Sequence, residues 1–146
     1  MKIYLDNCCF NRPFDSQISV RIRVETEAKL YIQEQIRKRR LQLVWSYMLD
    51  FENQANPFKE RRYSIARWKR LAGADIAGGN KTLRLAAALR RMGLGPKDVL
   101  HLACAIEGKC DYFLTTDDGI LKAAGHIKDI RIIDPPSFLR EVAHED

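Results

Sequence analysis

The sequence predicts an α/β protein in which a mainly parallel central sheet is sandwiched between helices. Short apolar segments that suit buried strands alternate along the chain with longer segments of helical periodicity. The composition, 46% hydrophobic and 30% charged residues, provides ample core material and a polar surface. The length of 146 residues suits one core, so we expect residues 1–146 to form a single domain.

The first expected strand, residues 2–5, precedes a loop and a long helix. Turn-forming residues in the segment 7–16 predict the loop. Ser16 or Ser19 can then cap an amphipathic helix over residues 20–37, which is long enough to cross over the sheet. The amphipathic pattern of this helix is expected to comprise Val24, Ala28, Tyr31 and Glu34, with Leu30 and Ile32 beside them.

A second strand is expected at residues 41–45, because apolar residues accumulate there as in a strand buried on both faces. Ser46 can cap a helix over residues 47–55, and a further helical run begins at Phe58. We expect Trp68 of that run to lie in the core rather than to stack on a base. The basic face of the run provides candidate RNA-binding residues: Arg61, Arg62, Tyr63, Arg67 and Arg70.

The second half of the chain is predicted to resume the alternation after a break at residues 73–79. Pro96 and Gly108 bound a helix that has Asp98 near its start. The other expected elements are a helix at 81–92, a strand beginning at 112, a strand at 130–133, a turn at 135–137 and a helix at 138–142.

Several acidic residues are expected to meet at one edge of the sheet. Asp6 and Asp117 follow strands, Asp98 opens a helix, and Glu52 lies on the helix after the second strand, where Asp50 is a rival. Ligands bind in the crevice at the carboxyl ends of parallel strands. Converging carboxylates repel unless a cation neutralises them, and oxygen ligands favour Mg²⁺ or Mn²⁺. The sequence therefore predicts a site for one of these ions.

Charge and cysteine content narrow the class of protein. A net charge of +6 and a pI of about 9.3 suit a nucleic-acid partner, although a solvated basic surface explains them equally well. The four cysteines form no C-x-x-C pair and are expected to be reduced thiols. No long apolar run and no signal peptide are visible, so we expect a cytoplasmic protein without a membrane span.

Three segments carry a family resemblance that extends over nearly the whole chain. They are Tyr4-Leu5-Asp6, then Lys97-Asp98-x-x-His101-x-Ala103-x-Ala105, then Asp111-Tyr112-Phe113-Leu114-Thr115-Thr116-Asp117. In this order and spacing they resemble the PIN-domain nucleases, including the VapC-like toxin ribonucleases of bacterial toxin–antitoxin pairs. The resemblance implies a PIN-like three-layer α/β/α fold. It also implies that Asp6, Asp98 and Asp117 bind metal, and that Glu52 matches the family's acid after the second strand.

The function implied is Mg²⁺- or Mn²⁺-dependent endoribonuclease activity, with Asp6, Glu52, Asp98 and Asp117 as catalytic and metal-binding residues. Asn7, Thr116 and Asp118 are candidates to support these acids by hydrogen bonding. His101 is expected to be a packed, hydrogen-bonded structural histidine rather than a general base. The expected partners are an RNA substrate and a cognate antitoxin protein, and the chain could form a homodimer.

Two other functions remain open at this point. The same fold could be a catalytically silent module that binds RNA or protein. A receiver-type phosphoacceptor is weaker, because it needs adjacent acids after the first strand and a strand-end lysine that the sequence does not place.

Overall fold

A five-stranded parallel sheet forms the centre of the computed structural model, which describes residues 1–143. Its strands are β1 (Lys2–Leu5), β2 (Gln42–Ser46), β3 (Ala74–Ile76), β4 (Tyr112–Leu114) and β5 (Arg131–Ile133). They lie in the order β3-β2-β1-β4-β5, and every neighbouring pair is parallel. The strand β1 is therefore central and has β2 and β4 as its neighbours. The parallel sheet confirms the α/β fold class that the sequence predicted.

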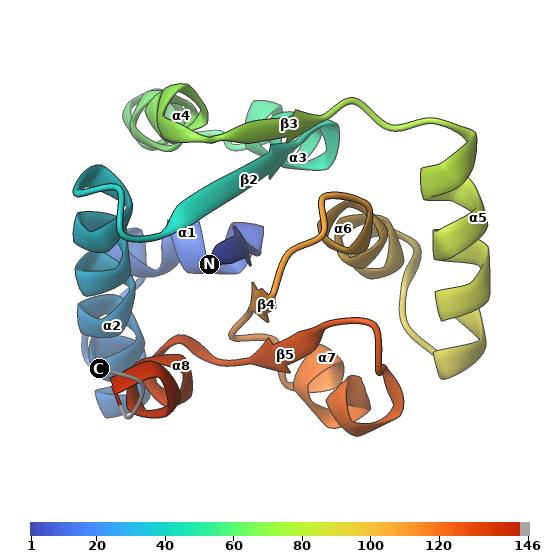
Figure 1. Ribbon diagram of the computed structural model, residues 1–146. Helices are drawn as coiled ribbons and strands as arrows, with labels where there is room; N and C mark the ends of the chain where they lie inside the picture. Colours follow the sequence, from blue (N-terminus) through green and yellow to red (C-terminus); the bar gives the residue numbers. More distant parts are fainter. Residues whose placement is uncertain (144–146) are drawn as a thin grey trace.

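Helices cover both faces of the sheet, which gives three layers (Figure 1). In Figure 1, α2 and α8 lie together on the left of the sheet, and α6 with α5 outside it lies on the right. The helices are α1 (Asn7–Asn11), α2 (Val20–Arg37), α3 (Tyr47–Gln54), α4 (Lys59–Ala66), α5 (Asn80–Leu89), α6 (Pro96–Glu107), α7 (Asp118–Ala123) and α8 (Pro135–Ala143). Within residues 1–143, no helix is long and apolar enough to cross a bilayer.

The core is built on the three central strands. Tyr4 of β1 is fully buried and stacks on Phe113 of β4, with ring centroids 5.3 Å apart. Trp45 of β2 is also fully buried and meets the edge of Phe10 on α1. Burial of such large side chains from both faces of the sheet is the main favourable term in folding and fixes the positions of the strand ends.

The predicted loop at residues 7–16 is wrong, because residues 7–14 of this segment are helical. The Asp6 carboxylate accepts a hydrogen bond from the Asn7 N–H and starts α1, and a 3-10 turn, Arg12–Phe14, follows. Cys9 and Phe10 are fully buried on the inner side of α1. The turn-forming residues of the segment therefore lie on a short capped helix that closes over the core.

Other element boundaries also differ from those expected. The break at residues 73–79 contains the edge strand β3, which is too short to show an alternating pattern. A helix, α7, follows Asp117 directly. The expected turn at residues 135–137 is the first turn of α8, where prolines are tolerated because its N–H groups have no partner within the helix.

The helix α2 has the predicted bounds but not the predicted face. Ser19 caps it, through a 3.4 Å hydrogen bond from the Ile22 N–H to the serine hydroxyl. Tyr31 is 56% exposed, whereas the polar residues Lys29 and Gln33 are buried. Ala28 and Ile32 are buried as expected, but Val24 and Leu30 are exposed, so the expected apolar side was wrong in part. Polar side chains occupy the rest of the inner face.

Candidate active site

Asp6 is held in a fixed position at the end of β1. Its side chain is 7% exposed, and its Oδ2 accepts a 2.8 Å hydrogen bond from the Thr115 hydroxyl. The Cys8 thiol donates to the same oxygen over 3.4 Å. The carboxylate is therefore fixed by groups from α1 and from the end of β4.

Asp117 lies at the end of the neighbouring strand, and Thr115 connects it to Asp6. The Asp117 N–H donates to the Thr115 hydroxyl at 3.1 Å, while the Asp117 carboxylate caps α7 by accepting from the Ile120 N–H at 3.1 Å. Because β1 and β4 are adjacent and parallel, the two acids emerge at the same edge of the sheet.

Asp98 lies in the first turn of α6, within the negative field of these acids. Partial burial raises the pKa of the Asp98 carboxyl, and the charges of Asp117 and then Asp6 raise it further. The charge of Glu52 acts in the same direction. The four predicted acids are therefore close enough to interact electrostatically.

Glu52 of α3, rather than Asp50, contacts Asn7, the residue that follows Asp6. One Glu52 oxygen pairs with His101 Nε2, and the other accepts from Asn7 Nδ2 at 3.3 Å. Burial raises the pKa of Glu52, but the hydrogen bond and charge of His101, together with Lys97, lower it by more. Asp50 instead accepts hydrogen bonds from the Trp45 indole N–H at 2.9 Å and from the Lys69 ammonium at 3.1 Å.

His101 is a buried link between Glu52 and the core, as a chain of hydrogen bonds shows. His101 Nδ1 lies 2.6 Å from the Tyr4 hydroxyl, which in turn lies 2.6 Å from the Ser46 hydroxyl. A neutral ring that donates from Nε2 to Glu52 accepts from Tyr4 at Nδ1. Burial raises the pKa of Tyr4, which keeps this donor protonated. The expectation of a packed, hydrogen-bonded histidine is confirmed.

Thr115 and the contact between His101 and Glu52 are the features that sequence reasoning missed. Thr116 was named instead of Thr115, but the Thr116 hydroxyl is buried without a hydrogen-bond partner among residues 1–143. Strand alternation could have indicated Thr115, because residues two apart share a face and Asp117 is two positions on. Asp118, another candidate, forms an ion pair with Arg21 on α2, at 2.8 Å.

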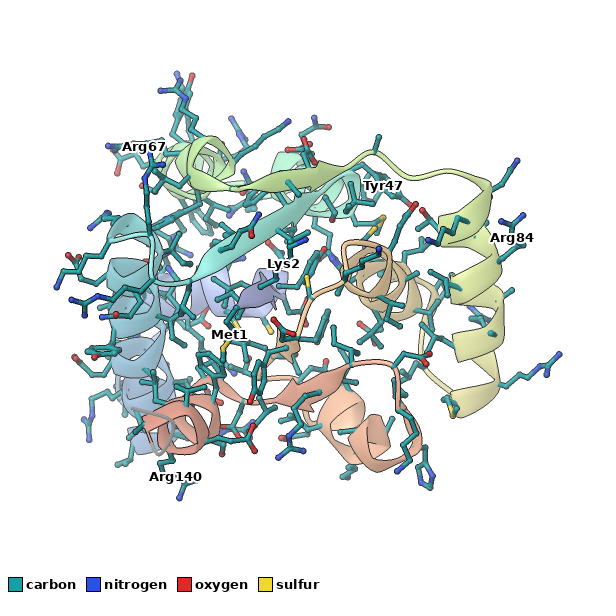
Figure 2. All side chains as sticks on the ribbon, in the orientation of Figure 1. Met1, Lys2, Tyr47, Arg67, Arg84 and Arg140 are labelled. Atoms are coloured by element: carbon teal, nitrogen blue, oxygen red, sulfur yellow. The ribbon has the colours of Figure 1, made fainter. Side chains whose placement is uncertain are left out.

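The basic candidates lie on α4 and on the 3-10 helix Arg67–Leu71 that follows it, and they differ in what they contact. Arg61 stacks on Phe58 at 4.0 Å, Arg62 donates to the Asn56 carbonyl at 2.9 Å, and Tyr63 is 63% exposed. Arg67 and Arg70 instead line a pocket beside Trp68, which is buried as expected. Figure 2 shows that labelled arginines such as Arg67, Arg84 and Arg140 project from different sides of the molecule. The positive charge is therefore spread over the surface.

The donor chemistry of the acid cluster fits a hard divalent cation. Carboxylate oxygens are the ligands that Mg²⁺ and Mn²⁺ prefer, and the raised pKa of Asp98 reflects a negative field that a cation would relieve. No group of three or more His, Cys, Asp or Glu side chains within the described part of the chain is arranged to hold a metal ion. The acids therefore lie near one another without forming a preassembled coordination shell.

The strand order and the helix layers define the PIN-like three-layer α/β/α fold, which confirms the fold implied by the sequence resemblance. VapBC2 from Rickettsia felis, in a structure bound to a DNA fragment from their promoter, superposes with a TM-score of 0.58 at 16% sequence identity, covering 90% of this chain and 97% of that one. FitAB bound to an IR36 DNA fragment superposes with a TM-score of 0.61 at 17% identity, covering 91% and 94%. No protein-family model and no curated protein matches the sequence.

Proposed function

We propose that the protein is a metal-dependent endoribonuclease whose site comprises Asp6, Glu52, Asp98 and Asp117. The observation that carries this proposal is that Asp6 and Asp117 follow adjacent parallel strands and are joined through the Thr115 hydroxyl, with Asp98 near enough for both charges to raise its pKa. Carboxylates that perturb one another in such a position are typical of sites that bind a cation and a phosphate.

The chain's own residues would hold Mg²⁺ or Mn²⁺ and keep the acids oriented. A bound cation would polarise the phosphate that is cleaved and would lower the pKa of a water molecule bound to it. Asp6, Asp98 and Asp117 would provide its oxygen ligands. Thr115 fixes the Asp6 carboxylate, and His101 and Asn7 fix that of Glu52.

We further propose that the enzyme is the toxin of a toxin–antitoxin pair. This rests on the likeness in fold to VapBC2 and FitAB, both solved in complexes with DNA fragments, and on the sequence resemblance to VapC-like toxins. The expected partner is a small DNA-binding antitoxin encoded in a neighbouring reading frame.

The direct test is incubation of the purified protein with labelled single-stranded RNAs, with Mg²⁺, with Mn²⁺ or with EDTA. Cleavage should require one of the ions and should disappear in Asp6→Asn and Asp117→Asn variants that remain folded. Undiminished cleavage in EDTA, by protein shown to be free of contaminating nuclease, would contradict the metal-dependent mechanism.

A second candidate function is a catalytically silent PIN-fold module that binds RNA or protein. The observation that favours it is that no described group of ligating side chains forms a preassembled metal shell, while Glu52 is already paired with His101. Binding of RNA without cleavage in any of these ions would select this function.

A further inference from the structure

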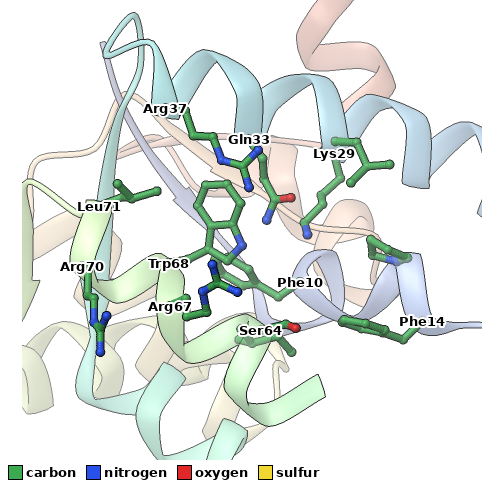
Figure 3. Close-up of a pocket in the computed structure, with 13 residues that line it drawn as sticks. Phe10, Phe14, Lys29, Gln33, Arg37, Ser64, Arg67, Trp68, Arg70 and Leu71 are labelled. Atoms are coloured by element: carbon green, nitrogen blue, oxygen red, sulfur yellow. The ribbon is translucent and has the colours of Figure 1, made fainter. Parts of the chain in front are cut away.

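A second site lies away from the acid cluster, in a pocket of about 440 Å³ that opens between three segments of the fold (Figure 3). We call it the Lys29 pocket and define it by Phe10 of α1, Lys29, Gln33 and Arg37 of α2, and Arg67 and Trp68 of the 3-10 helix Arg67–Leu71. Its volume is within the range of about 300–1,000 Å³ that is usual for small-ligand pockets. None of the proposed catalytic acids lines it.

The floor of the pocket contains a buried cation without a counter-ion. Lys29 is 4% exposed, and no acidic residue of the described chain lines the pocket around it. It faces the rings of Phe10 and Trp68, at 5.6 and 6.0 Å from their centroids. Burial of an unpaired ammonium is strongly unfavourable, so this group is poised to accept an anionic partner.

Gln33 provides a second unused donor one helical turn away. It is 5% exposed, and its Nε2 has no hydrogen-bond partner within the described residues. Lys29 and Gln33 lie four positions apart, so they share one face of α2, and Figure 3 shows both side chains directed toward Trp68. The neighbouring Tyr31 is exposed instead. The inner face of α2 thus presents hydrogen-bond donors where core packing alone would favour apolar side chains.

The rim of the pocket is also cationic. The Arg37 guanidinium stacks over Trp68 at 5.0 Å, and it forms an exposed ion pair with Glu34 at 3.6 Å. Arg67 and Arg70 make no ion pair with any described residue and line the same pocket. The lining residues within the described chain include no acid. Four cations around one opening favour a multiply charged anion.

We propose that the Lys29 pocket binds a nucleotide, with the phosphate on Lys29, Gln33 and the arginines and the base against Phe14. The cations match a phosphate, which carries more charge and more acceptor oxygens than a carboxylate. Phe14 is half-buried and lines the pocket, so its ring can serve as the platform for a base, whereas Phe10 is fully buried and Trp68 is 8% exposed. The nucleotide can be free or part of an RNA or DNA chain.

The inference does not depend on the proposed cleavage, and binding can be measured in EDTA. Wild-type protein is titrated calorimetrically with AMP, UMP, GMP and CMP, with adenosine, with inorganic phosphate and with a short single-stranded oligonucleotide. A nucleoside monophosphate should bind more tightly than phosphate or adenosine, and its binding should change Trp68 fluorescence. Binding of the oligonucleotide but of no mononucleotide would assign the site to a nucleotide within a chain.

Matched variants connect the binding to this pocket. Lys29→Met keeps the apolar length of the side chain and should weaken nucleotide binding at least about ten-fold, the loss expected for one charge-assisted hydrogen bond. Gln33→Leu should weaken it less, and Lys81→Met, an exposed lysine on α5, should leave it unchanged. Thermal melts confirm that each variant is folded.

Three results would overturn the proposal. They are the absence of binding by every nucleotide and oligonucleotide at millimolar concentration, equal binding by Lys29→Met and wild type, and equal affinity for inorganic phosphate and for mononucleotides. Preferential binding of an acidic peptide that depends on Lys29 would assign the pocket to a protein partner and would also overturn it. None of these results bears on metal-dependent cleavage, which the RNA assay tests separately.

Discussion

At the scale of single residues, Asp98 is a carboxyl whose surroundings disfavour its charged form. Its pKa is raised in the folded protein by burial and by neighbouring acids, so the stability it contributes is present at acid pH and is lost as pH rises through the raised pKa. At neutral pH the ionised Asp98 therefore works against the fold, unless a cation is bound.

We predict that Asp98→Asn loses cleavage but remains folded. In EDTA its melting temperature should equal or slightly exceed that of wild type, and the difference should shrink as pH falls below the pKa of Asp98. Added Mg²⁺ should raise the melting temperature of wild type more than that of the variant, because a ligand of the folded state stabilises in proportion to its occupancy.

The matched control is Asp129→Asn, an exposed change remote from the acid cluster. It should alter neither activity nor the response to metal. If Asp98→Asn melted far below wild type in EDTA, Asp98 would be a structural residue of the first turn of α6, and its assignment to the metal would have to be withdrawn.

Lys29 is the second residue whose charged form is disfavoured by its surroundings in the folded protein. Burial lowers its pKa from 10.5 to about 8, and nearby Arg37 lowers it while Cys9 raises it. Arg67 and Arg70 line the same pocket. At roughly 1.4 kcal/mol per pKa unit, the shift corresponds to at most about 3–4 kcal/mol.

Lys29→Met should therefore be more stable than wild type at pH 7. Because the unfolded chain binds more protons between about pH 8 and 10.5, wild type should gain stability over this window and approach the variant. Urea unfolding at several pH values measures the gap. A variant less stable than wild type at pH 7 would mean that Lys29 has a favourable role in the fold.

His101 should act on the site through Glu52. We predict that His101→Phe remains folded but raises the pKa of Glu52, because the hydrogen bond and charge that lower it are removed. The acid limb of the pH profile of cleavage should then shift to higher pH, and carboxyl NMR of Glu52 should show the same direction. The exposed His126 provides the control, since His126→Phe should change neither measurement.

At the scale of elements, the caps of α2 and α3 differ in how much each one supports. Ser46 is fully buried, caps α3 through the Leu49 N–H and also contacts Tyr4. Ser19 caps α2 at an exposed position, and its hydroxyl makes no second hydrogen bond with residues 1–143. The two serines therefore form a natural pair for comparison.

Ser46→Ala should lower the free energy of unfolding by about 2–3 kcal/mol. The change removes the cap of α3 and also removes one hydrogen-bond partner of the buried Tyr4 hydroxyl. Ser19→Ala should cost about 0.5–1 kcal/mol, the usual value for an exposed cap. Chemical denaturation of both variants measures the difference. Equal costs would show that the contact of Ser46 with Tyr4 contributes nothing to stability.

The elements also show which features a sequence can predict. The long helix α2 and the unit from Pro96 to Leu114 were predicted because they carry caps, apolar periodicity and terminal glycine or proline. The strand β3 and the helix α1 were missed because three and five residues are too few for a periodic pattern. The positions of the acids followed from strand ends, whereas the contact of His101 with Glu52 joins residues 49 positions apart and has no local signal.

At the scale of the whole molecule, the net charge of +6 is distributed over several surfaces. If Arg61, Arg62, Arg67 and Arg70 each contact a phosphate, the logarithm of RNA affinity should fall steeply with the logarithm of salt concentration. Each lost contact should reduce the slope by roughly 0.7 for a single strand. Binding isotherms of single and combined alanine variants, at several salt concentrations in EDTA, measure these slopes.

An unchanged slope in the variants would assign the arginines to a solvated surface. The structure divides them into two groups, because Arg67 and Arg70 line the Lys29 pocket and Arg61 and Arg62 do not. Arg84 on α5, remote from this pocket in Figure 2, is the matched control. Arg84→Ala should leave the slope as in wild type.

The two outer strands of the sheet, β3 and β5, are only three residues long. An open edge can recruit a strand from another chain, which leads to aggregation or to binding by strand addition. Edges this short offer few backbone groups for such pairing. The sheet is therefore protected against edge-to-edge growth, and another protein chain would have to dock on the helices that cover it.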